Sequence, residues 1–264
     1  MKWTATRIQS SKGREKLACL TAADVAVAQL LDQAGIPLIL VGDSLGMTTL
    51  GYDTTLPVTL NDMLHHTAAV VRGVKKALVI ADMPFMTYQV SPGQALRNAG
   101  RLVQDAGADG VKIEGGALRV RTVERLVKNG IPVLGHLGLT PQSVRALGGY
   151  KVQGRKPAEA KQIVDDAKAL AKAGIFALVL ECIPEELARE ITEAIDVPTI
   201  GIGAGRYCDG QILVTADVLG IETGVKAKFS KQYAQVGPIM HQAFRDYLQD
   251  VSSGAFPAPE HTFQ

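Results

Sequence analysis

Short apolar runs recur along the chain, and most of them show no alternation of polar and apolar residues. The clear runs cover residues 17–21, 37–41, 77–81, 110–113, 132–134, 177–180 and 198–202. A further run at residues 212–218 is less distinct, because it contains Asp217. Runs rich in Val, Ile and Leu are typical of strands that are covered on both faces, as in a parallel sheet.

Segments with helical periodicity separate the runs, and they cover residues 23–34, 61–76, 92–106, 118–129, 157–173 and 184–195. Asn61 and Ser91 are the expected N-caps of two of these helices. Strands and helices that alternate this regularly predict a parallel sheet. The number of repeats within 264 residues favours a closed barrel over an open doubly wound sheet. We therefore expect an α/β protein with a single (β/α)8 TIM-barrel domain over residues 1–264.

The end of the chain predicts elements outside the barrel. Residues 229–248 have the periodicity of an additional helix, and residues 256–264 are expected to form a surface arm. Residues 229–264 are therefore expected to be a C-terminal helical extension and arm. No internal repeat or low-complexity linker in the sequence marks a second domain.

Composition excludes several classes of partner. Charges nearly balance, with 28 basic and 26 acidic residues, and no basic stripe points to nucleic acid. No apolar run approaches the ~18 residues of a membrane span, and the N-terminus lacks the apolar core of a signal peptide. Cys19, Cys182 and Cys208 are widely spaced, which indicates free thiols in a reducing compartment. We expect a cytoplasmic protein.

Ionisable and glycine-rich residues follow most of the expected strands. Catalytic groups of such barrels lie at the carboxyl ends of the strands. In this chain those positions hold Asp43 and Ser44, Asp82, Lys112 and Glu114, His136, Glu181, and a glycine-rich segment at residues 203–205. The period of two along a strand places Lys112 and Glu114 on the same side.

The carboxylates among these residues suggest a metal site. Oxygen ligands from Asp43, Asp82 and Glu114 suit Mg²⁺, a hard cation that keeps several waters and leaves room for substrate. The thiolate and imidazole ligands of a structural zinc site do not occur in this pattern.

Each residue also has a simpler explanation when it is taken alone. An aspartate at a strand end is often the cap of the next turn, and Lys112 and Glu114 could form a structural ion pair. His136 could be a hydrogen-bonded core histidine. Glu181 is harder to explain in this way, because an isolated buried carboxylate is costly. The long loop at residues 139–154 is either a lid or a structural excursion.

Longer motifs around these positions resemble a known family. They are VGDSLGM at 41–47, LPVT at 56–59, ADMPFM at 81–86, VKIEGG at 111–116, GHLGLTPQS at 135–143, GGYKVQG at 148–154, LVLEC at 178–182, and IGIGAG at 200–205 with DGQ at 209–211. Over nearly its whole length the chain resembles the ketopantoate hydroxymethyltransferases of pantothenate biosynthesis.

This resemblance implies an activity, a fold and an assembly. Enzymes of the family are metal-dependent (β/α)8 barrels that form homo-oligomers, usually decamers. They transfer a hydroxymethyl group from 5,10-methylenetetrahydrofolate to 3-methyl-2-oxobutanoate, which gives 2-dehydropantoate. The implied partners are therefore a small 2-oxo acid and a folate, and the implied cofactor is Mg²⁺.

The resemblance also implies residue roles. Asp43 and Asp82 would bind Mg²⁺ directly, and Glu114 would complete the metal environment. The residues that would contact the oxo acid are Asp43, Ser44, Asp82, Lys112 and His136. Glu181 would be the catalytic base that removes a proton next to the ketone, while the cation stabilises the enolate.

Two departures from the family and three rival interpretations accompany this hypothesis. Many relatives have Tyr at the position of Ala23, and some have His at the position of Tyr52. The first rival is another Mg²⁺-dependent 2-oxo-acid lyase or aldolase on the same barrel. A Schiff-base aldolase with Lys112 as the nucleophile is the second. A barrel that only binds a metabolite anion is the third.

Overall fold

The computed structural model describes residues 1–221 and 227–263. By their internal contacts, the residues divide into two compact units, Met1–Val214 and Thr215–Gln264. The sequence predicted one domain over residues 1–264, with an extension from residue 229.

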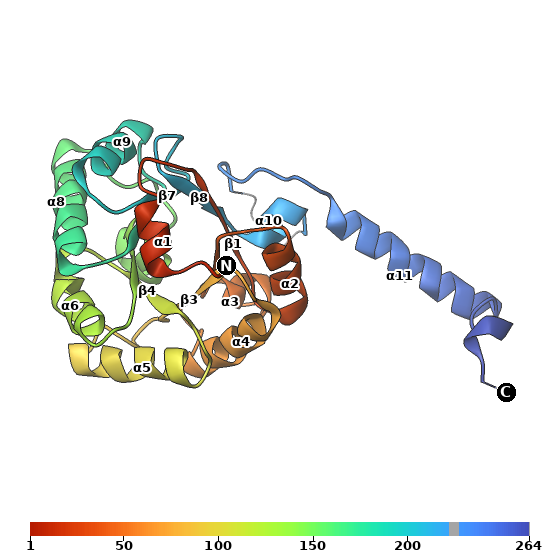
Figure 1. Ribbon diagram of the computed structural model, residues 1–264. Helices are drawn as coiled ribbons and strands as arrows, with labels where there is room; N and C mark the ends of the chain where they lie inside the picture. Colours follow the sequence, from red (N-terminus) through yellow and green to blue (C-terminus); the bar gives the residue numbers. More distant parts are fainter. Residues whose placement is uncertain (222–226, 264) are drawn as a thin grey trace. The chain divides into compact units, whose positions relative to one another are not determined.

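The first unit contains a closed barrel of parallel strands in chain order, which confirms the predicted fold class (Figure 1). Pairing of the first strand with the last closes the barrel. The strands are β1 (Leu17–Thr21), β2 (Leu38–Val41), β3 (Leu78–Asp82), β4 (Gly110–Glu114), β5 (Val133–Gly138), β6 (Ala177–Glu181), β7 (Thr199–Ile202) and β8 (Gly210–Leu213).

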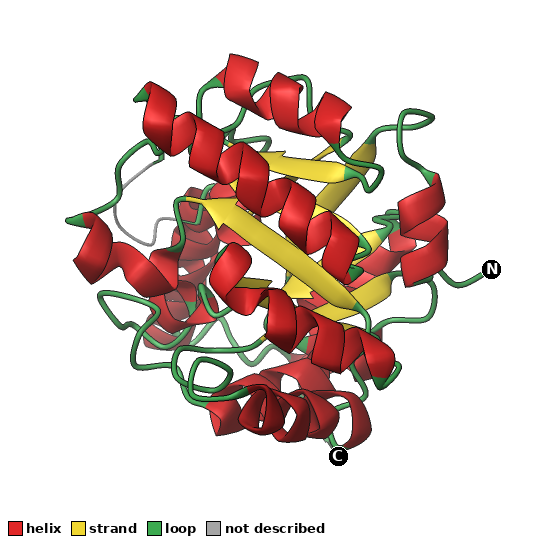
Figure 2. Cartoon of the chain, turned by 90° about the vertical axis from the view of Figure 1, so that its left-hand side faces the viewer, coloured by secondary structure: helices red, strands yellow, loops and turns green. Residues whose placement is uncertain are grey.

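Helices surround the barrel, as Figures 1 and 2 show. The long ones are α2 (Val25–Gln33), α4 (Leu60–Gly73), α5 (Pro92–Gln104), α6 (Val120–Lys128), α8 (Pro157–Ala173) and α9 (Glu185–Ala194). Shorter helical segments are α1 (Ala5–Ser10), α3 (Leu45–Thr48), η1 (Ala117–Arg119), η2 (Pro141–Ser143) and α7 (Val144–Leu147).

Several strands extend further than the apolar runs predicted. β3, β4 and β6 each include the acidic residue that follows the run, and β5 continues through His136 to Gly138. The apolar runs ended at Ala81, Ile113, Leu134 and Leu180, before these residues. The backbone ladder continues because it depends on main-chain groups and not on side-chain polarity.

The predicted strand at residues 212–218 is wrong in its extent. β8 begins at Gly210 and ends at Leu213, and residues Thr215–Leu219 form helix α10. An apolar run by itself does not distinguish a strand from a short helix. Asp217, which made the run indistinct, lies in the first turn of α10, where a negative charge interacts favourably with the helix dipole.

Of the two predicted N-caps, only Ser91 is confirmed. Its side chain accepts a hydrogen bond from the backbone N–H of Gln94 at 3.1 Å. Asn61 lies inside α4, whose N-cap is Thr59. Thr59 and Asp62 form a reciprocal capping box, which satisfies two backbone N–H groups and so fixes the start of the helix earlier than predicted.

Apolar side chains at alternate strand positions fill the inside of the barrel. This cluster includes Leu17, Cys19, Leu38, Leu40, Leu78, Ile80, Leu134, Val179, Ile200 and Ile212. The other faces of the strands pack against the helices in a second cluster. Because side chains alternate along a strand, Asp82, His136 and Glu181 continue the inward-facing series that Ile80, Leu134 and Val179 begin.

Helix α1 closes the amino end of the barrel. Ile8 is fully buried in the interior cluster. The loop that follows α1 is fixed by the buried Asp209, which accepts hydrogen bonds from the Gly13 N–H at 3.0 Å and from Lys12 Nζ at 2.9 Å. Asp209 also accepts from the Thr199 N–H at 2.9 Å. Among the described residues, the amino end of the barrel interior is thus covered by α1 and the loop that follows it.

The second unit contains α10, α11 (Val236–Ser253) and η3 (Pro259–His261). The helix predicted over residues 229–248 therefore begins and ends later than expected. A helix from residue 229 would carry Pro238 in its middle, whereas proline is tolerated in a first turn, where its missing N–H has no intrahelical role. Gln264, at the end of the predicted arm, lies outside the described residues. No helix among those described is long and apolar enough to cross a membrane.

Asp32 of α2 ties that helix to the start of β3. Its carboxylate accepts the backbone N–H groups of Lys75, Lys76 and Ala77 at 3.0, 2.8 and 2.7 Å. Burial by itself would raise the pKa of Asp32, but these hydrogen bonds outweigh that effect and lower it below its usual range.

We expect Asp32→Asn to lower the free energy of unfolding by about 1–3 kcal/mol at pH 7, because charge-assisted hydrogen bonds are lost. The folded pKa is depressed, so this stabilisation is complete above the unfolded pKa of about 3.9 and is lost as pH falls through the folded value. Urea unfolding of wild type and variant from pH 7 to pH 3 measures the difference. Asp105→Asn, at an exposed helix end, is the control. A difference that does not shrink at low pH would contradict this role.

Candidate active site

The strand register brings four predicted site residues together inside the barrel. Asp82 of β3 pairs with Lys112 of β4, and Glu114 of β4 pairs with His136 of β5. All four are buried, and so is Asp43, which follows β2. The structure therefore places at the carboxyl ends of adjacent strands the residues that the sequence predicted there.

Lys112 lies between two carboxylates. Its Nζ is 2.5 Å from Asp82 Oδ1 and 3.5 Å from Glu114 Oε1. Burial alone would lower the pKa of Lys112, but the neighbouring carboxylates reverse the effect and raise it. Lys112 is therefore a fixed positive charge in the floor of the site.

His136 lies between two further carboxylates. Its Nδ1 is 3.3 Å from Glu114 Oε1, and its Nε2 is 3.2 Å from Glu181 Oε2. Neither contact has the alignment of a hydrogen bond. Burial lowers the pKa of His136, but the two carboxylates outweigh burial and raise it to about 9. The two carboxylates thus favour the protonated form of the ring, which lies between them.

The pKa values of the buried carboxylates are shifted in different directions by burial and by the neighbouring charges. Burial, together with the charges of Asp82 and Glu114, raises the pKa of Asp43 well above its usual range. Burial also raises the pKa of Asp82, even though Lys112 opposes the effect. The pKa of Glu114 is lowered despite burial, because Lys112 and His136 both stabilise its charged form. Negative charge is thus least compensated around Asp43 and Asp82.

This pair of aspartates fits a hard divalent cation. The backbone N–H of Asp43 donates to Asp82 Oδ2 at 3.0 Å, which holds the two residues side by side. Within residues 1–221 and 227–263, no three acidic, imidazole or thiol side chains already surround one point. Mg²⁺ needs only one or two protein carboxylates, because water and substrate complete its octahedron. The predicted ligand set of Asp43, Asp82 and Glu114 stays a prediction.

Glu181 is the outermost member of the group. Its side chain is 15% exposed, compared with 3% for His136. The backbone around it is constrained: Cys182 has a left-handed φ of 47°, and a Cβ at Gly138 would lie 2.2 Å from the carbonyl oxygen of Glu181. Only glycine at residue 138 therefore lets β5 and β6 stay in register where Glu181 faces the opening.

Ser44 is at the N-cap of α3 and is partly exposed. A Cβ at Gly42 would lie 2.9 Å from Ser44 Oγ and 3.5 Å from Asp82 Oδ2. Glycine at this position lets the hydroxyl approach the aspartate pair. The substrate contact predicted for Ser44 stays a prediction.

Sequence reasoning missed two residues of the site, Gln142 and Tyr88. Both are buried, and their hydrogen bonds reach Asp43 and Glu114. Gln142 lies in the loop at residues 139–154, where no local periodicity identifies a buried glutamine. The signal that could have identified it is the motif GHLGLTPQS at 135–143, which contains Gln142 and follows His136 closely.

The same loop is not irregular throughout. It contains η2 and α7, and its backbone is fixed where the Gln153 N–H donates to the Cys182 carbonyl at 2.9 Å. Tyr150 near its tip is exposed, with its hydroxyl 3.8 Å from Met47 Sδ. Its role as a lid or as a structural excursion stays a prediction.

The two departures from the family lie in short turns. Ala23 precedes α2, and its carbonyl oxygen is 2.7 Å from His66 Nδ1. Tyr52 follows α3, and its N–H donates to the Gly46 carbonyl at 2.8 Å.

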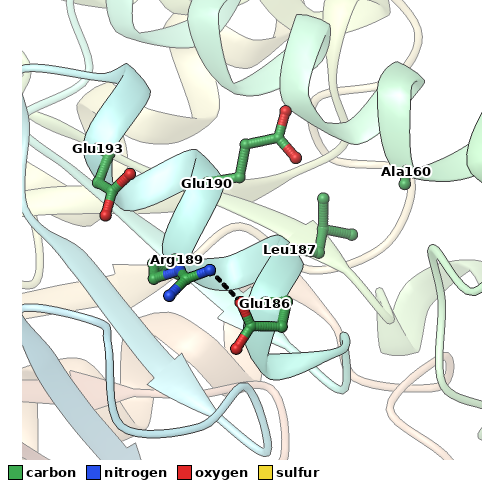
Figure 3. A pocket seen from close by; sticks show the side chains of 6 residues that line it. All are labelled: Ala160, Glu186, Leu187, Arg189, Glu190 and Glu193. Carbon is green, nitrogen blue, oxygen red and sulfur yellow. Dashed lines mark ion pairs between the residues drawn. The ribbon is translucent and has the colours of Figure 1, made fainter.

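A separate hollow of about 480 Å³ lies between α8 and α9 (Figure 3). It is lined by Ala160, Glu186, Leu187, Arg189, Glu190 and Glu193. Arg189 forms an ion pair with Glu186 there. None of the predicted site residues contributes to this hollow.

In protein freed of metal with EDTA, we expect the His136 ring to stay protonated at pH 7.5 and to titrate near pH 9. This pKa lies above the ordinary value of about 6.5. The imidazolium therefore contributes stability that is complete below about pH 6.5 and is lost as pH rises through about 9. Imidazole ¹⁵N shifts measure the titration, and His136→Gln assigns the signals. A midpoint at or below 6.5 would contradict the charge pattern.

Comparison with known proteins places the chain. The family model described as ketopantoate hydroxymethyltransferase matches residues 2–259. The 3-methyl-2-oxobutanoate hydroxymethyltransferase of Syntrophomonas wolfei is 54% identical over 252 residues, which cover 96% of this chain and 91% of that protein. The enzyme of the same name from Thermoanaerobacter sp. strain X514 is 56% identical over 260 residues, with 98% and 95% covered.

A solved structure with the same fold is that of 2,3-dimethylmalate lyase, a member of the PEP mutase/isocitrate lyase superfamily. Its TM-score is 0.62 at 17% identity, and the match covers 99% of this chain and 92% of that chain. This likeness shows the fold alone. The family match and the two relatives above show that the chain belongs to the ketopantoate hydroxymethyltransferase family of enzymes.

Proposed function

We propose that this enzyme transfers a hydroxymethyl group from 5,10-methylenetetrahydrofolate to 3-methyl-2-oxobutanoate, forming 2-dehydropantoate in the first committed step of pantothenate biosynthesis. The names of its relatives specify the oxo acid and the transferred group. The observation that carries the proposal is the position of Glu181 at the opening of a buried charged group that includes Lys112 and Asp82.

The reaction begins with removal of a proton from C3 of the oxo acid, which lies next to the ketone and is weakly acidic. Glu181 is the base, because it is the most exposed carboxylate of the group and accepts the proton on its side-chain oxygen. The His136 imidazolium, 3.2 Å from Glu181 Oε2, holds that carboxylate in place.

Asp43 and Asp82 would hold Mg²⁺ directly, and Glu114 would complete its environment. When bound, Mg²⁺ supplies positive charge at the keto and carboxylate oxygens of the oxo acid, which favours loss of the C3 proton. Ser44 would bind the same oxygens through its hydroxyl group.

Lys112 contributes charge and not covalent chemistry. A Schiff base requires a neutral amine, whereas the Lys112 ammonium is held by Asp82 at 2.5 Å and its pKa is raised. Lys112 therefore stabilises negative charge on the oxo acid, and the Schiff-base interpretation of the sequence is disfavoured.

The second half of the reaction forms a bond between C3 and the one-carbon unit. The carbon leaves the folate nitrogens, and balance of atoms requires that water provide the hydroxyl oxygen. His136 would orient a ligand in this step.

The test is exchange of the C3 proton of 3-methyl-2-oxobutanoate in deuterium oxide, followed by NMR without folate. We expect exchange that requires Mg²⁺ and that falls about 10²–10⁴-fold in Glu181→Gln, because the base is lost. Glu186→Gln, on α9 outside the site, is the matched control and should exchange at the wild-type rate.

The same assay separates the rival interpretations. Absence of exchange in folded protein loaded with Mg²⁺ would argue against both the base and the substrate, and would favour a barrel that only binds anions. Exchange with no transfer from the folate would favour a related 2-oxo-acid lyase. Borohydride labelling of Lys112 in the presence of the oxo acid, with activity that survives EDTA, would restore the Schiff-base mechanism.

We also infer that the enzyme works as a homo-oligomer, a decamer by its family resemblance. Helix α11 has no buried residue. Its large apolar side chains recur at spacings of three and four residues and are exposed: Ile239, Met240, Phe244, Tyr247, Leu248 and Val251. A continuous apolar stripe of this kind is unfavourable in water, and further copies of the chain would cover it.

We expect Phe244→Glu to shift the protein to a smaller assembly, because a charge within the stripe opposes its burial. Light scattering coupled to size exclusion measures the mass. Gln242→Glu, away from the stripe on the same helix, is the control and should leave the mass unchanged. An unchanged mass for Phe244→Glu would show that α11 is not the interface.

Finally, we place the enzyme in the cytoplasm. Cys19, Cys182 and Cys208 are free thiols, and unpaired cysteines are typical of proteins from reducing compartments.

A further inference from the structure

Gln142 is a buried glutamine, 5% exposed, whose side-chain amide uses its full hydrogen-bonding capacity. Its Nε2 donates to Asp43 Oδ2 at 2.9 Å and to the carbonyl oxygen of Met83 at 3.0 Å. Its Oε1 accepts from the Tyr88 hydroxyl at 2.8 Å and from Gln89 Nε2 at 3.1 Å. A glutamine amide has two donor hydrogens and two acceptor lone pairs, so none of them is left over.

These partners allow only one orientation of the amide. A carboxylate and a backbone carbonyl can only accept hydrogen bonds, so Nε2 must face Asp43 and Met83. Rotating the amide by 180° would place Oε1 against both acceptors and would leave two buried polar contacts repulsive. The direction of the donor toward Asp43 is therefore fixed by the surrounding groups.

Gln142 also holds Glu114, through its backbone. The Gln142 N–H donates to Glu114 Oε2 at 3.1 Å. Tyr88 completes a ring of contacts, because its hydroxyl accepts the Glu114 N–H at 3.1 Å while it donates to Gln142 Oε1. One residue of the loop after β5 thus joins the carboxylates that follow β2 and end β4.

Gln142 donates a hydrogen bond to one oxygen of Asp43 and to one oxygen of Glu114, and the second oxygen of each carboxylate is not bonded to Gln142. Asp43 keeps Oδ1, and Glu114 keeps Oε1, which faces Lys112 at 3.5 Å and His136 at 3.3 Å. Without the Gln142 amide, Asp43 could rotate and present a different oxygen, whereas Glu114 is held by the backbone N–H of residue 142.

We propose that Gln142 is a positioning residue that fixes which oxygens of Asp43 and Glu114 are presented to the cation. The inference rests on the proposed function, because it assigns these carboxylates to a metal environment. Gln142 itself donates no atom to the cation or to the substrate; it acts through the two carboxylates. Residues that orient metal ligands in this way commonly change metal affinity by about 10–100-fold when they are replaced.

The test is the affinity of the full-length protein for Mn²⁺, measured by electron paramagnetic resonance in the absence of oxo acid and folate. We expect Gln142→Met, which keeps the length of the side chain and removes the amide, to weaken Mn²⁺ binding about 10–100-fold. Raising the metal concentration should recover much of the C3 exchange rate, because the base Glu181 is untouched.

Gln153→Met is the matched control. Gln153 belongs to the same loop, and among the described residues its side chain donates to the carbonyl oxygen of Lys151 and not to a carboxylate. We expect this variant to bind Mn²⁺ as the wild type does. Thermal unfolding of both variants, followed by circular dichroism, shows whether each is folded at the assay temperature.

The outcomes separate the inference from the function on which it rests. If the wild type binds Mn²⁺ and folded Gln142→Met binds it equally well, the inference fails and the metal site stands. A wild-type protein that binds no Mn²⁺ contradicts the metal site and the inference together. If Gln142→Met does not fold, Gln142→Asn decides: it keeps an amide but withdraws the donor from Asp43 Oδ2, and unchanged Mn²⁺ binding would overturn the inference.

Discussion

The arrangement of the site depends on keeping the Lys112 ammonium charged inside a protein interior. A buried charge is costly unless it is paired and hydrogen-bonded, and Lys112 is 4% exposed. The parallel register supplies its partners, because Asp82 is opposite Lys112 on the neighbouring strand and Glu114 lies two residues further along its own strand. Replacing one of these groups alone would leave the others uncompensated.

The closed barrel makes this arrangement possible because it separates an apolar region from a polar region along each strand. Apolar side chains such as Ile80 and Leu134 fill the interior toward the amino ends, where α1 covers it. The polar residues two positions later share the same inward direction but lie at the open end. The hydrophobic core and the charged site are thus consecutive layers of one interior, and the core holds the strands in the register that the site requires.

Neutral hydrogen-bonding groups fix the orientation of the carboxylates, which the neighbouring charges alone do not fix. Lys112 and His136 balance part of the negative charge, but a point charge does not determine how a carboxylate rotates. Directional hydrogen-bond donors determine this rotation. The Gln142 amide donates to Asp43 at 2.9 Å, and the Gln142 backbone N–H donates to Glu114 at 3.1 Å. The loop after β5 therefore contributes to the structure of the site through Gln142.

The sequence by itself was sufficient to predict the fold class and to place most of the charged residues of the candidate site at strand ends. Apolar runs and helical periods are local signals, so the barrel was predictable, and so was the position of Asp82, Lys112, His136 and Glu181 at strand ends. Strand ends, the start of α4 and the extent of β8 were not predictable to the residue, because hydrogen-bonded ladders and caps decide them. Only the tertiary structure decided that His136 bridges two carboxylates and that Gln142 reaches Asp43, 99 positions away in sequence. Contacts of that kind depend on closure of the barrel, which no local pattern encodes.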